Sequence, residues 1–314
     1  MSNSDSIQPN SLIPKADEQL PLPVFTPPIL GEMITSSMTG NTYKIGGSIG
    51  EGNFGVVYAC SDTWENELAA KILKPRNQPY ETIKKEAVDE FYKLLTLRNP
   101  FITFIYDAFE FRHTFYIITE RCFKTVRDLF SLPNYNGAVW VKPIARCLLQ
   151  AVHFIHLNGF AHQDIHLGNV FCSFVKDEVV PDDNPVLKFK LGDLGIAKLV
   201  QHMDANNTFL GEWMRPPEAI NANEFGPLDQ RIDVYHCGLL LLQVLLGKEV
   251  TFTREEILAG KPREIALKLF PPYNFAIEKA LRRHVIYRTA SAIELWRDLK
   301  VPEQTATEAK IENQ

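Results

Sequence analysis

The pattern of hydrophobic and polar positions divides the chain into two parts of different secondary structure. From residue 43 to about 122, short runs rich in β-branched and aromatic residues alternate with turn residues, which predicts strands. One helix is expected within this part, over 81–97, because apolar side chains recur there at helical spacing. Beyond residue 122, helical patterns dominate, most clearly at 145–157 and 233–246. We therefore expect an α+β fold with a small strand-rich lobe and a larger helical lobe.

The two ends of the chain lack this periodicity. Residues 1–42 are rich in proline, serine and threonine, and we expect them to form a disordered leader. Residues 301–314 are polar and are expected to form a frayed tail. The folded domain is thus predicted to cover 43–300, with its smaller lobe at 43–121 and its larger lobe at 122–300.

Composition narrows the class of protein. The 314 residues carry a net charge of −5, which argues against a general nucleic-acid or anionic-membrane partner. The five cysteines stand singly, as is typical of free thiols in a reducing compartment. The start lacks a signal peptide, and the longest apolar run, 238–247, is half the length of a membrane span. We expect no membrane span and a cytoplasmic protein, although export without such a signal stays open, as does the oligomeric state.

Residues 49–57, IGEGNFGVV, supply the pattern G-x-G-x-x-G-x-V between two predicted strands. Glycines at 50, 52 and 55 let a backbone approach phosphate oxygens and adopt positive φ angles. A dinucleotide-binding fold would place a helix directly after them, whereas a further strand follows here. Lys71 then lies within an apolar strand, where it can pair with phosphates.

A second group of polar residues follows the predicted helix at 145–157. The segment His162-Gln163-Asp164-Ile165-His166-Leu167-Gly168-Asn169 places an asparagine five residues after an aspartate. Such a carboxylate can orient an acceptor hydroxyl, and the amide oxygen can bind Mg²⁺. A further carboxylate, Asp193, follows in Leu191-Gly192-Asp193-Leu194-Gly195.

In this order the motifs resemble those of the eukaryotic-type protein kinase family, over residues 43 to 299. The resemblance implies a bilobal kinase fold, with an antiparallel sheet and one helix in the smaller lobe. It implies ATP and Mg²⁺ as cofactors and a protein substrate that presents serine or threonine. Asp164, Lys71, Asn169 and His166 would be catalytic, with Asn169 and Asp193 at the metal. The implied nucleotide-binding residues are Ile49, Gly50, Gly52, Gly55, Val57, Ala69, Lys71, Glu90, Thr119, Glu120 and Cys122.

The resemblance also implies specific contacts. Lys71 should pair with a glutamate of the helix at 81–97, and Glu90 is favoured over Glu86 by its distance from Pro100. Backbone groups of Glu120 and Cys122 should bind adenine, with Thr119 behind the pocket. Two further expectations are an Arg288–Glu218 pair and a packed column beneath the cleft, anchored by Asp233. The column comprises Leu94, Ile105, His162 and Leu194.

Four departures from the family pattern bear on activity. Gln163 replaces the arginine that receives an activation-loop phosphate in many kinases, so activation of that kind is not expected. His166 replaces a lysine that neutralises the transferring phosphate, and histidine is only partly charged near neutral pH. Leu194 replaces a phenylalanine, and residues 210–215 lack a threonine common before Pro-Glu. A surface insertion is expected between Ser173 and Phe189.

Three functions are compatible with these residues. The first is ATP-dependent phosphoryl transfer to a protein hydroxyl. The second is a kinase-like scaffold that binds partners and transfers little phosphate, which the residues at 163 and 166 suggest. The third is a small-molecule kinase, because H-x-D-x-H-x-x-N also occurs in phosphotransferases related to protein kinases.

Overall fold

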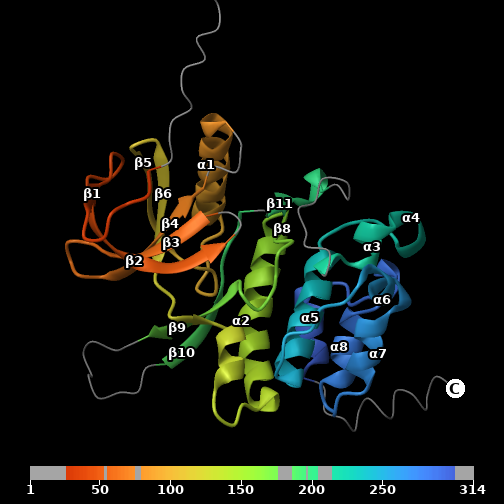
Figure 1. The fold of residues 1–314 in the computed structure, drawn as a ribbon. Helices are drawn as coiled ribbons and strands as arrows, with labels where there is room; N and C mark the ends of the chain where they lie inside the picture. Colours follow the sequence, from red (N-terminus) through yellow and green to blue (C-terminus); the bar gives the residue numbers. More distant parts are fainter. Residues whose placement is uncertain are drawn as a thin grey trace, which may run out of the picture.

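The computed structural model describes residues 26–52, 55–74, 79–175, 186–195, 197–203 and 214–300. These residues form two lobes, a sheet with one helix and a larger, mainly helical part (Figure 1). The smaller lobe holds a six-stranded sheet in the order β1-β2-β3-β4-β6-β5, and every neighbouring pair is antiparallel. Its strands are β1 (Met33–Thr35), β2 (Thr42–Gly52), β3 (Gly55–Ser61), β4 (Glu67–Leu73), β5 (Ile105–Phe111) and β6 (Thr114–Glu120).

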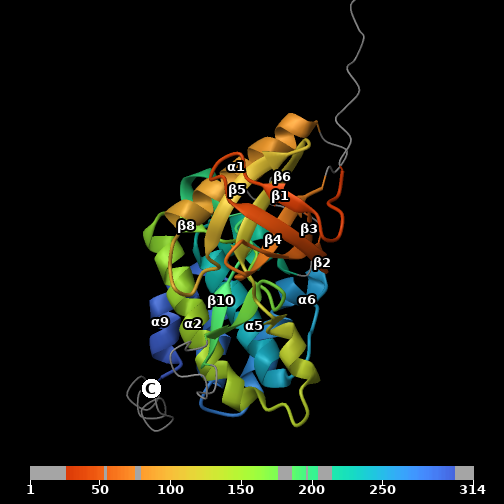
Figure 2. The ribbon, with the colours of Figure 1, turned by 90° about the vertical axis from the view of Figure 1, so that its left-hand side faces the viewer.

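Helix α1 (Tyr80–Thr96) lies along one face of this sheet (Figures 1 and 2). Its buried positions are Ile83, Ala87, Glu90 and Leu94, which recur every three or four residues and so share one side of the helix. Three are apolar and pack on the core, and the fourth is a carboxylate. The apolar stripe that forms the helix therefore also directs Glu90 inward.

The larger lobe contains most of the helices. In chain order its elements are β7 (Lys124–Thr125), the 3-10 helix η1 (Arg127–Ser131), α2 (Gly137–Leu157), β8 (Phe160–Ala161), β9 (Val170–Val175), β10 (Val186–Leu191), β11 (Lys198–Leu199), η2 (Val200–His202), α3 (Pro217–Ile220), α4 (Ala222–Phe225), α5 (Arg231–Leu246), α6 (Arg254–Ala259), α7 (Lys261–Leu267), α8 (Asn274–Ala280), η5 (Val285–Tyr287) and α9 (Ala292–Asp298). Helices α2 and α5 pack together at the centre, where nearly all of α5 is buried.

Helix α2 begins eight residues before the predicted position. Pro143 and the β-branched residues around it argue against helix in the sequence, yet Asn136 caps the helix by accepting a hydrogen bond from the Ala138 N–H. Among the described residues α2 alone has the length and hydropathy of a membrane span, and half of that window is buried inside the fold. It packs against α5, α9 and β10, as a core helix does.

The predicted boundary at residue 43 lies too late. Residues 33–35 form β1, which pairs with β2 at the edge of the sheet, and Ile34 is fully buried beneath it. Thr39 and Tyr43 both donate hydrogen bonds to Asp107 on β5, at 2.5 and 2.9 Å. These contacts hold residues 33–42 against the domain, and composition alone gives no sign of them. Residues 1–25 of the predicted leader and the predicted tail, 301–314, lie outside the described residues.

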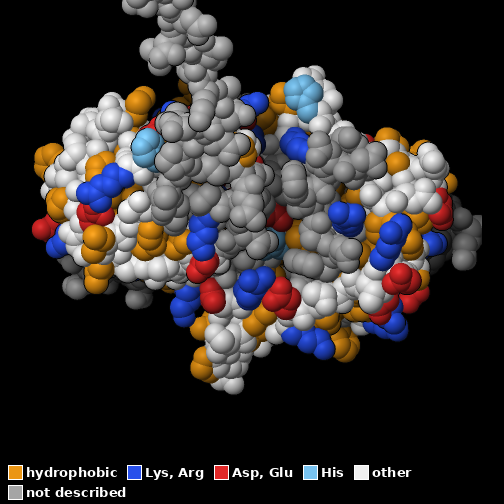
Figure 3. All heavy atoms as spheres, turned by 45° about the horizontal axis from the view of Figure 1, so that its top comes forward, with side chains coloured by type: hydrophobic (Ala, Val, Ile, Leu, Met, Phe, Trp, Pro, Cys, Tyr) orange, Lys and Arg blue, Asp and Glu red, His pale blue; other side chains and the backbone are white. Residues whose placement is uncertain are grey.

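The expected insertion begins later than predicted. Residues 173–175 continue β9 and residues 186–189 belong to β10, and the two strands pair in unbroken register from Val170↔Leu191 to Val175↔Val186. The proline-containing part of the insertion lies outside the described residues. On the face shown in Figure 3, basic and acidic side chains lie next to one another with hydrophobic ones between them, so this face is not uniformly basic.

Candidate active site

The glycine-rich segment forms the hairpin of β2 and β3, whose tip at residues 53–54 lies outside the described residues. The expectation of positive φ is wrong for Gly50 and Gly55, which lie in extended strands. Gly55 is required for a different reason. A Cβ there would come within 2.2 Å of the Ile72 carbonyl oxygen on β4. The close approach of β3 to β4 thus excludes any side chain at 55.

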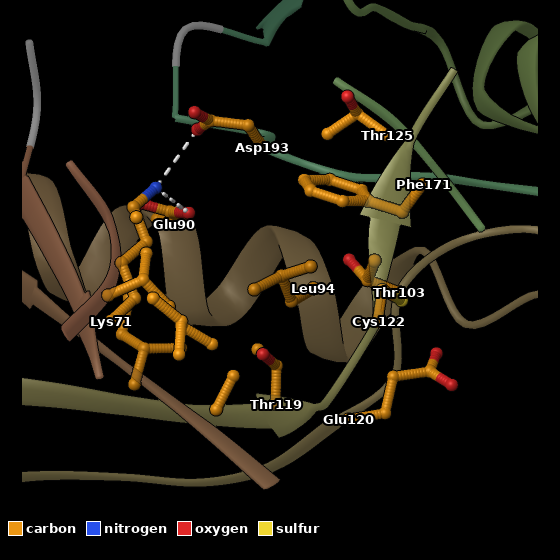
Figure 4. Close-up of a pocket in the computed structure, with 15 residues that line it drawn as sticks. Lys71, Glu90, Leu94, Thr103, Thr119, Glu120, Cys122, Thr125, Phe171 and Asp193 are labelled. Atoms are coloured by element: carbon orange, nitrogen blue, oxygen red, sulfur yellow. Dashed lines mark hydrogen bonds and ion pairs between the residues drawn. The ribbon is translucent and has the colours of Figure 1, made fainter. Parts of the chain in front are cut away.

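Lys71 on β4 joins two carboxylates from distant parts of the chain. Its Nζ lies 2.7 Å from Glu90 Oε1 on α1 and 2.9 Å from Asp193 Oδ1 (Figure 4). The predicted choice of Glu90 over Glu86 is confirmed. Burial acts to lower the pKa of Lys71, but the attraction of Asp193 and Glu90 outweighs it and raises that pKa. The same attraction lowers the pKa of Asp193 against the effect of its own burial. The lysine is therefore a permanent cation.

This ion-pair cluster lies at one end of a cavity of about 270 Å³ between the lobes. Nine of the residues predicted at the nucleotide line it, together with Asp193, which was predicted at the metal: Ile49, Gly50, Val57, Ala69, Lys71, Glu90, Thr119, Glu120 and Cys122. Sequence reasoning missed a further five, namely Leu94, Thr103, Ile117, Thr125 and Phe171. Phe171 follows Asn169 by two residues, in the continuous apolar run Val170-Phe171-Cys172, and this strand-like run was the available signal. Among the described residues predicted at the site, Gly55, Asp164, His166 and Asn169 do not line the cavity.

The opposite end of the cavity is formed by the segment after β6. The Glu120 carboxylate points away from Lys71 (Figure 4) and accepts two hydrogen bonds from Lys190, at 2.6 and 2.8 Å. The Glu120 N–H donates to the Phe104 carbonyl at 2.9 Å. The predicted contact of Glu120 with adenine would therefore use its carbonyl oxygen, beside the backbone groups of Cys122.

Asp233, at the start of α5, accepts hydrogen bonds that position the catalytic loop, residues 162–169. One oxygen accepts hydrogen bonds from the His162 N–H and from His156, both at 2.8 Å, and the other accepts from the Gln163 N–H at 2.8 Å. The Asp233 side chain is fully buried, and burial acts to raise its pKa. The hydrogen bond from His156 and the charges of nearby histidines outweigh burial, so the pKa is lowered. Gln163 takes φ of 68°, a strained value that the two backbone contacts hold.

The four residues of the predicted column are all buried. Leu94, Ile105 and Leu194 belong to one buried hydrophobic cluster, and His162 is completely buried. His162 Nε2 lies 3.0 Å from the Gly192 carbonyl, which ties the catalytic loop to the segment that carries Asp193. Leu194, where the resemblance implies a phenylalanine, is fully buried in this cluster.

Asp164, His166 and Asn169 form one hydrogen-bonded group in the loop between β8 and β9. Asn169 Nδ2 donates to the Asp164 carbonyl at 2.9 Å and to its carboxylate at 3.0 Å. His166 Nε2 lies 3.7 Å from Asp164 Oδ1, and Nδ1 accepts the Gly168 N–H at 3.0 Å. Because Nδ1 is an acceptor, the proton of the neutral ring is on Nε2. Burial lowers the pKa of His166 despite the opposing charge of Asp164.

The segment around Asp193 is held by its backbone conformation and by Lys93, a residue that was not predicted from the sequence. Its φ of 59° lies in the left-handed region, and the Gly192 N–H donates to the Asn169 carbonyl at 2.9 Å. Lys93, one turn beyond Glu90 on α1, directs its Nζ to the Gly195 and Leu194 carbonyls at 3.3 and 3.5 Å. Helix α1 therefore supports the segment around Asp193 through its backbone as well as through Lys71.

The buried pair expected in the larger lobe is also confirmed. Arg288 Nη1 and Nη2 donate to the two oxygens of Glu218 on α3, at 2.5 and 2.6 Å. Both side chains are at most 1% exposed. Residues 210–213, which carry the predicted departure before Pro216, lie outside the described residues.

Comparison with known proteins agrees with this geometry. The family model for the protein kinase domain matches residues 43–289. The chain is 26% identical to Cyclin-dependent kinase-like 1 of Caenorhabditis elegans, over 67% of this chain and 56% of that protein. It is 28% identical to mouse Cyclin-dependent kinase-like 5, over 73% and 24%. It is 27% identical to a probable serine/threonine-protein kinase PLK of Dictyostelium discoideum, over 66% and 20%. The chain thus spans about half or less of these relatives' lengths, and through its own domain it belongs to the protein kinase family.

Proposed function

We propose that this chain transfers the γ-phosphate of ATP to a serine or threonine hydroxyl of a protein. The observation that carries the proposal is the position of Lys71, which contacts both Glu90 and Asp193 at the inner end of a largely apolar cavity. A largely apolar space that ends in a fixed cation suits a nucleotide base followed by phosphates. Serine/threonine specificity is supported by the names of relatives such as the Dictyostelium protein.

The oxygen donors near Asp193 suit Mg²⁺. The ion commonly takes one or two carboxylates and completes its shell with phosphates and water. Asp193 supplies a carboxylate. Asn169 supplies an amide oxygen, and its backbone carbonyl accepts a hydrogen bond from the Gly192 N–H, next to Asp193. Among the described residues no three His, Cys, Asp or Glu side chains form a metal cluster, so these two donors with the nucleotide are the proposed set. A bound Mg²⁺ would neutralise charge on the phosphates.

Asp164 is the residue proposed to orient the acceptor hydroxyl. Asn169 holds one of its oxygens at 3.0 Å and fixes the direction of the carboxylate. The other oxygen faces His166 at 3.7 Å. Catalysis in this family is mainly positioning and charge compensation, so a fixed carboxylate beside a bound nucleotide is the required arrangement.

The scaffold alternative is favoured by one observation. His166 stands where the resemblance implies a lysine, and burial lowers its pKa, so it is uncharged near pH 7. A neutral N–H compensates less negative charge than an ammonium group does, which predicts slow transfer. The small-molecule alternative is disfavoured by the Arg288–Glu218 pair, which belongs to the protein-kinase form of the larger lobe.

The test uses the purified chain with Mg²⁺, γ-labelled ATP and a generic protein substrate, beside Asp164→Ala and Lys71→Ala. We expect the parent to label serine or threonine and both variants to lose activity by about a hundredfold or more. A panel of small alcohols serves as the competing acceptor. Label on those alcohols alone would refute the proposal. No transfer, with ATP still raising the melting temperature, would leave the scaffold function instead.

A further inference from the structure

A second cavity, of about 200 Å³, lies in the larger lobe, away from the nucleotide cavity. It forms where the start of α7 meets the segment that follows α8, and these two helices lie side by side (Figure 1). Its lining residues are Arg263, Arg282, Arg283, His284 and Tyr287, and none of them lines the nucleotide cavity. Three of the five are arginines. We call this the arginine pocket.

The arginine pocket has more positive than negative charge. Its nearest carboxylate is Glu278 on α8, whose side chain is 5% exposed. Glu278 accepts hydrogen bonds from Arg263 Nε and from Arg282 Nε and Nη2, the last two at 3.2 and 3.1 Å. Arg283 instead donates to the Leu258 carbonyl at 2.8 Å. Three guanidinium groups against one carboxylate leave an excess of two positive charges.

The pocket also has unused donors. Arg263 contacts Glu278 through Nε, and within the described part of the chain its two Nη nitrogens have no hydrogen-bond partner. Its side chain is 45% exposed. A guanidinium group donates through a planar fork that fits two oxygens of a phosphate or carboxylate. The outer edge of Arg263 is thus positioned to bind a tetrahedral oxyanion.

The walls of the pocket are fixed in advance. Arg288, which is already paired with Glu218, donates to the backbone carbonyls of Arg282 and Arg283 at 3.1 and 3.3 Å. Arg231 donates to the Val285 carbonyl at 3.0 Å. The chain between 282 and 288 is therefore held from inside the lobe, and ligand binding orders little backbone.

We propose that the arginine pocket binds the phosphate group of a phosphorylated serine or threonine in a partner protein. A phosphate monoester carries close to two negative charges at pH 7, which matches the excess. Ile286 and Tyr287, beside the pocket, are 77% and 63% exposed and offer apolar contacts to residues that flank the phosphate. This binding site is separate from the proposed reaction and uses none of its residues.

The probe is a labelled Gly/Ala peptide with a central phosphoserine, titrated by fluorescence anisotropy into the full chain. Its unphosphorylated form and inorganic phosphate are the comparison ligands. Arg263→Gln is the main variant, since Glu278 keeps Arg282 as its partner. Arg146→Gln, on the exposed side of α2, makes the same charge change elsewhere. Thermal unfolding of each variant checks the fold, and Arg283→Gln replaces a cation that does not contact Glu278.

We expect the phosphopeptide to bind more tightly than the unphosphorylated peptide and than inorganic phosphate. Arg263→Gln and Arg283→Gln should each weaken that binding about tenfold, as for the loss of one charge-assisted contact, whereas Arg146→Gln should not. Equal binding by parent and both pocket variants would overturn the proposal and place the phosphopeptide elsewhere, such as in the catalytic cleft. Inorganic phosphate that binds as tightly as the peptide would also overturn it, as would arginine-dependent binding only to anionic lipid vesicles.

Discussion

The Arg288–Glu218 pair offers a quantitative test of how the larger lobe is stabilised. Glu218→Ala leaves the Arg288 guanidinium in a site that is closed to water, where its side chain is 0% exposed. Three backbone carbonyls, those of Arg231, Arg282 and Arg283, still accept from it. They satisfy its donors but do not neutralise its charge. Removal of one partner from such a pair destabilises a protein by about 3–5 kcal/mol.

The matched control is Glu249→Ala. Glu249 lies 2.9 Å from Arg127, but the two side chains are 38% and 47% exposed, so water screens the pair. Exposed pairs contribute about 0–1 kcal/mol. For a domain of this size 1 kcal/mol corresponds to about 2–4 °C in melting temperature. We therefore expect a loss of about 6–20 °C for Glu218→Ala and at most about 4 °C for Glu249→Ala.

Thermal unfolding, followed by calorimetry or far-UV circular dichroism at one scan rate, measures both. Equal and small losses in the two variants would refute the reasoning, because they would mean that the buried guanidinium finds another counter-charge. Glu218→Gln refines the result, since it keeps hydrogen-bond acceptance and removes only the charge.

Three further predictions concern single side chains. His166→Lys replaces a neutral ring with a permanent charge and should raise kcat about tenfold at pH 7.5 under saturating ATP; an unchanged or lower kcat would contradict the role assigned to position 166. Lys93→Met should lower kcat about threefold to tenfold through loss of its contacts to the Asp193 segment, while Lys85→Met on the exposed side of α1 should have no effect in the same assay. Burial lowers the pKa of His236, although the charge of Asp233 acts to raise it. As the pH falls, this histidine is therefore protonated in the unfolded state at a higher pH than in the folded state. Stability should be constant above about pH 6.5 and fall below it, and His236→Gln should flatten that decline in urea titrations.

Much of the candidate site follows from local sequence. The spacing of Asp164 and Asn169, and the position of Asp193 between two glycines, are properties of short segments. The choice of Glu90 over Glu86 likewise came from one helix, through its distance from Pro100. The structure agrees, since Glu90 lies on the buried stripe formed by Ile83, Ala87 and Leu94. In each case the residues that act together lie within a few turns or bonds of one another, and chain geometry alone relates them.

The Arg288–Glu218 pair joins distant segments and was implied by the family resemblance. Other contacts between distant segments were decided only by the tertiary structure. Thr39 binds Asp107 across 68 positions, so composition alone suggested a leader where a strand forms. Lys190 binds Glu120 and Arg263 lies beside Arg282 for the same reason: each pair meets through packing of separate elements. Sequence periodicity reports which face of a helix or strand is buried, whereas it carries no information on which other element covers that face. The catalytic motifs could therefore be predicted, and the arginine pocket could not.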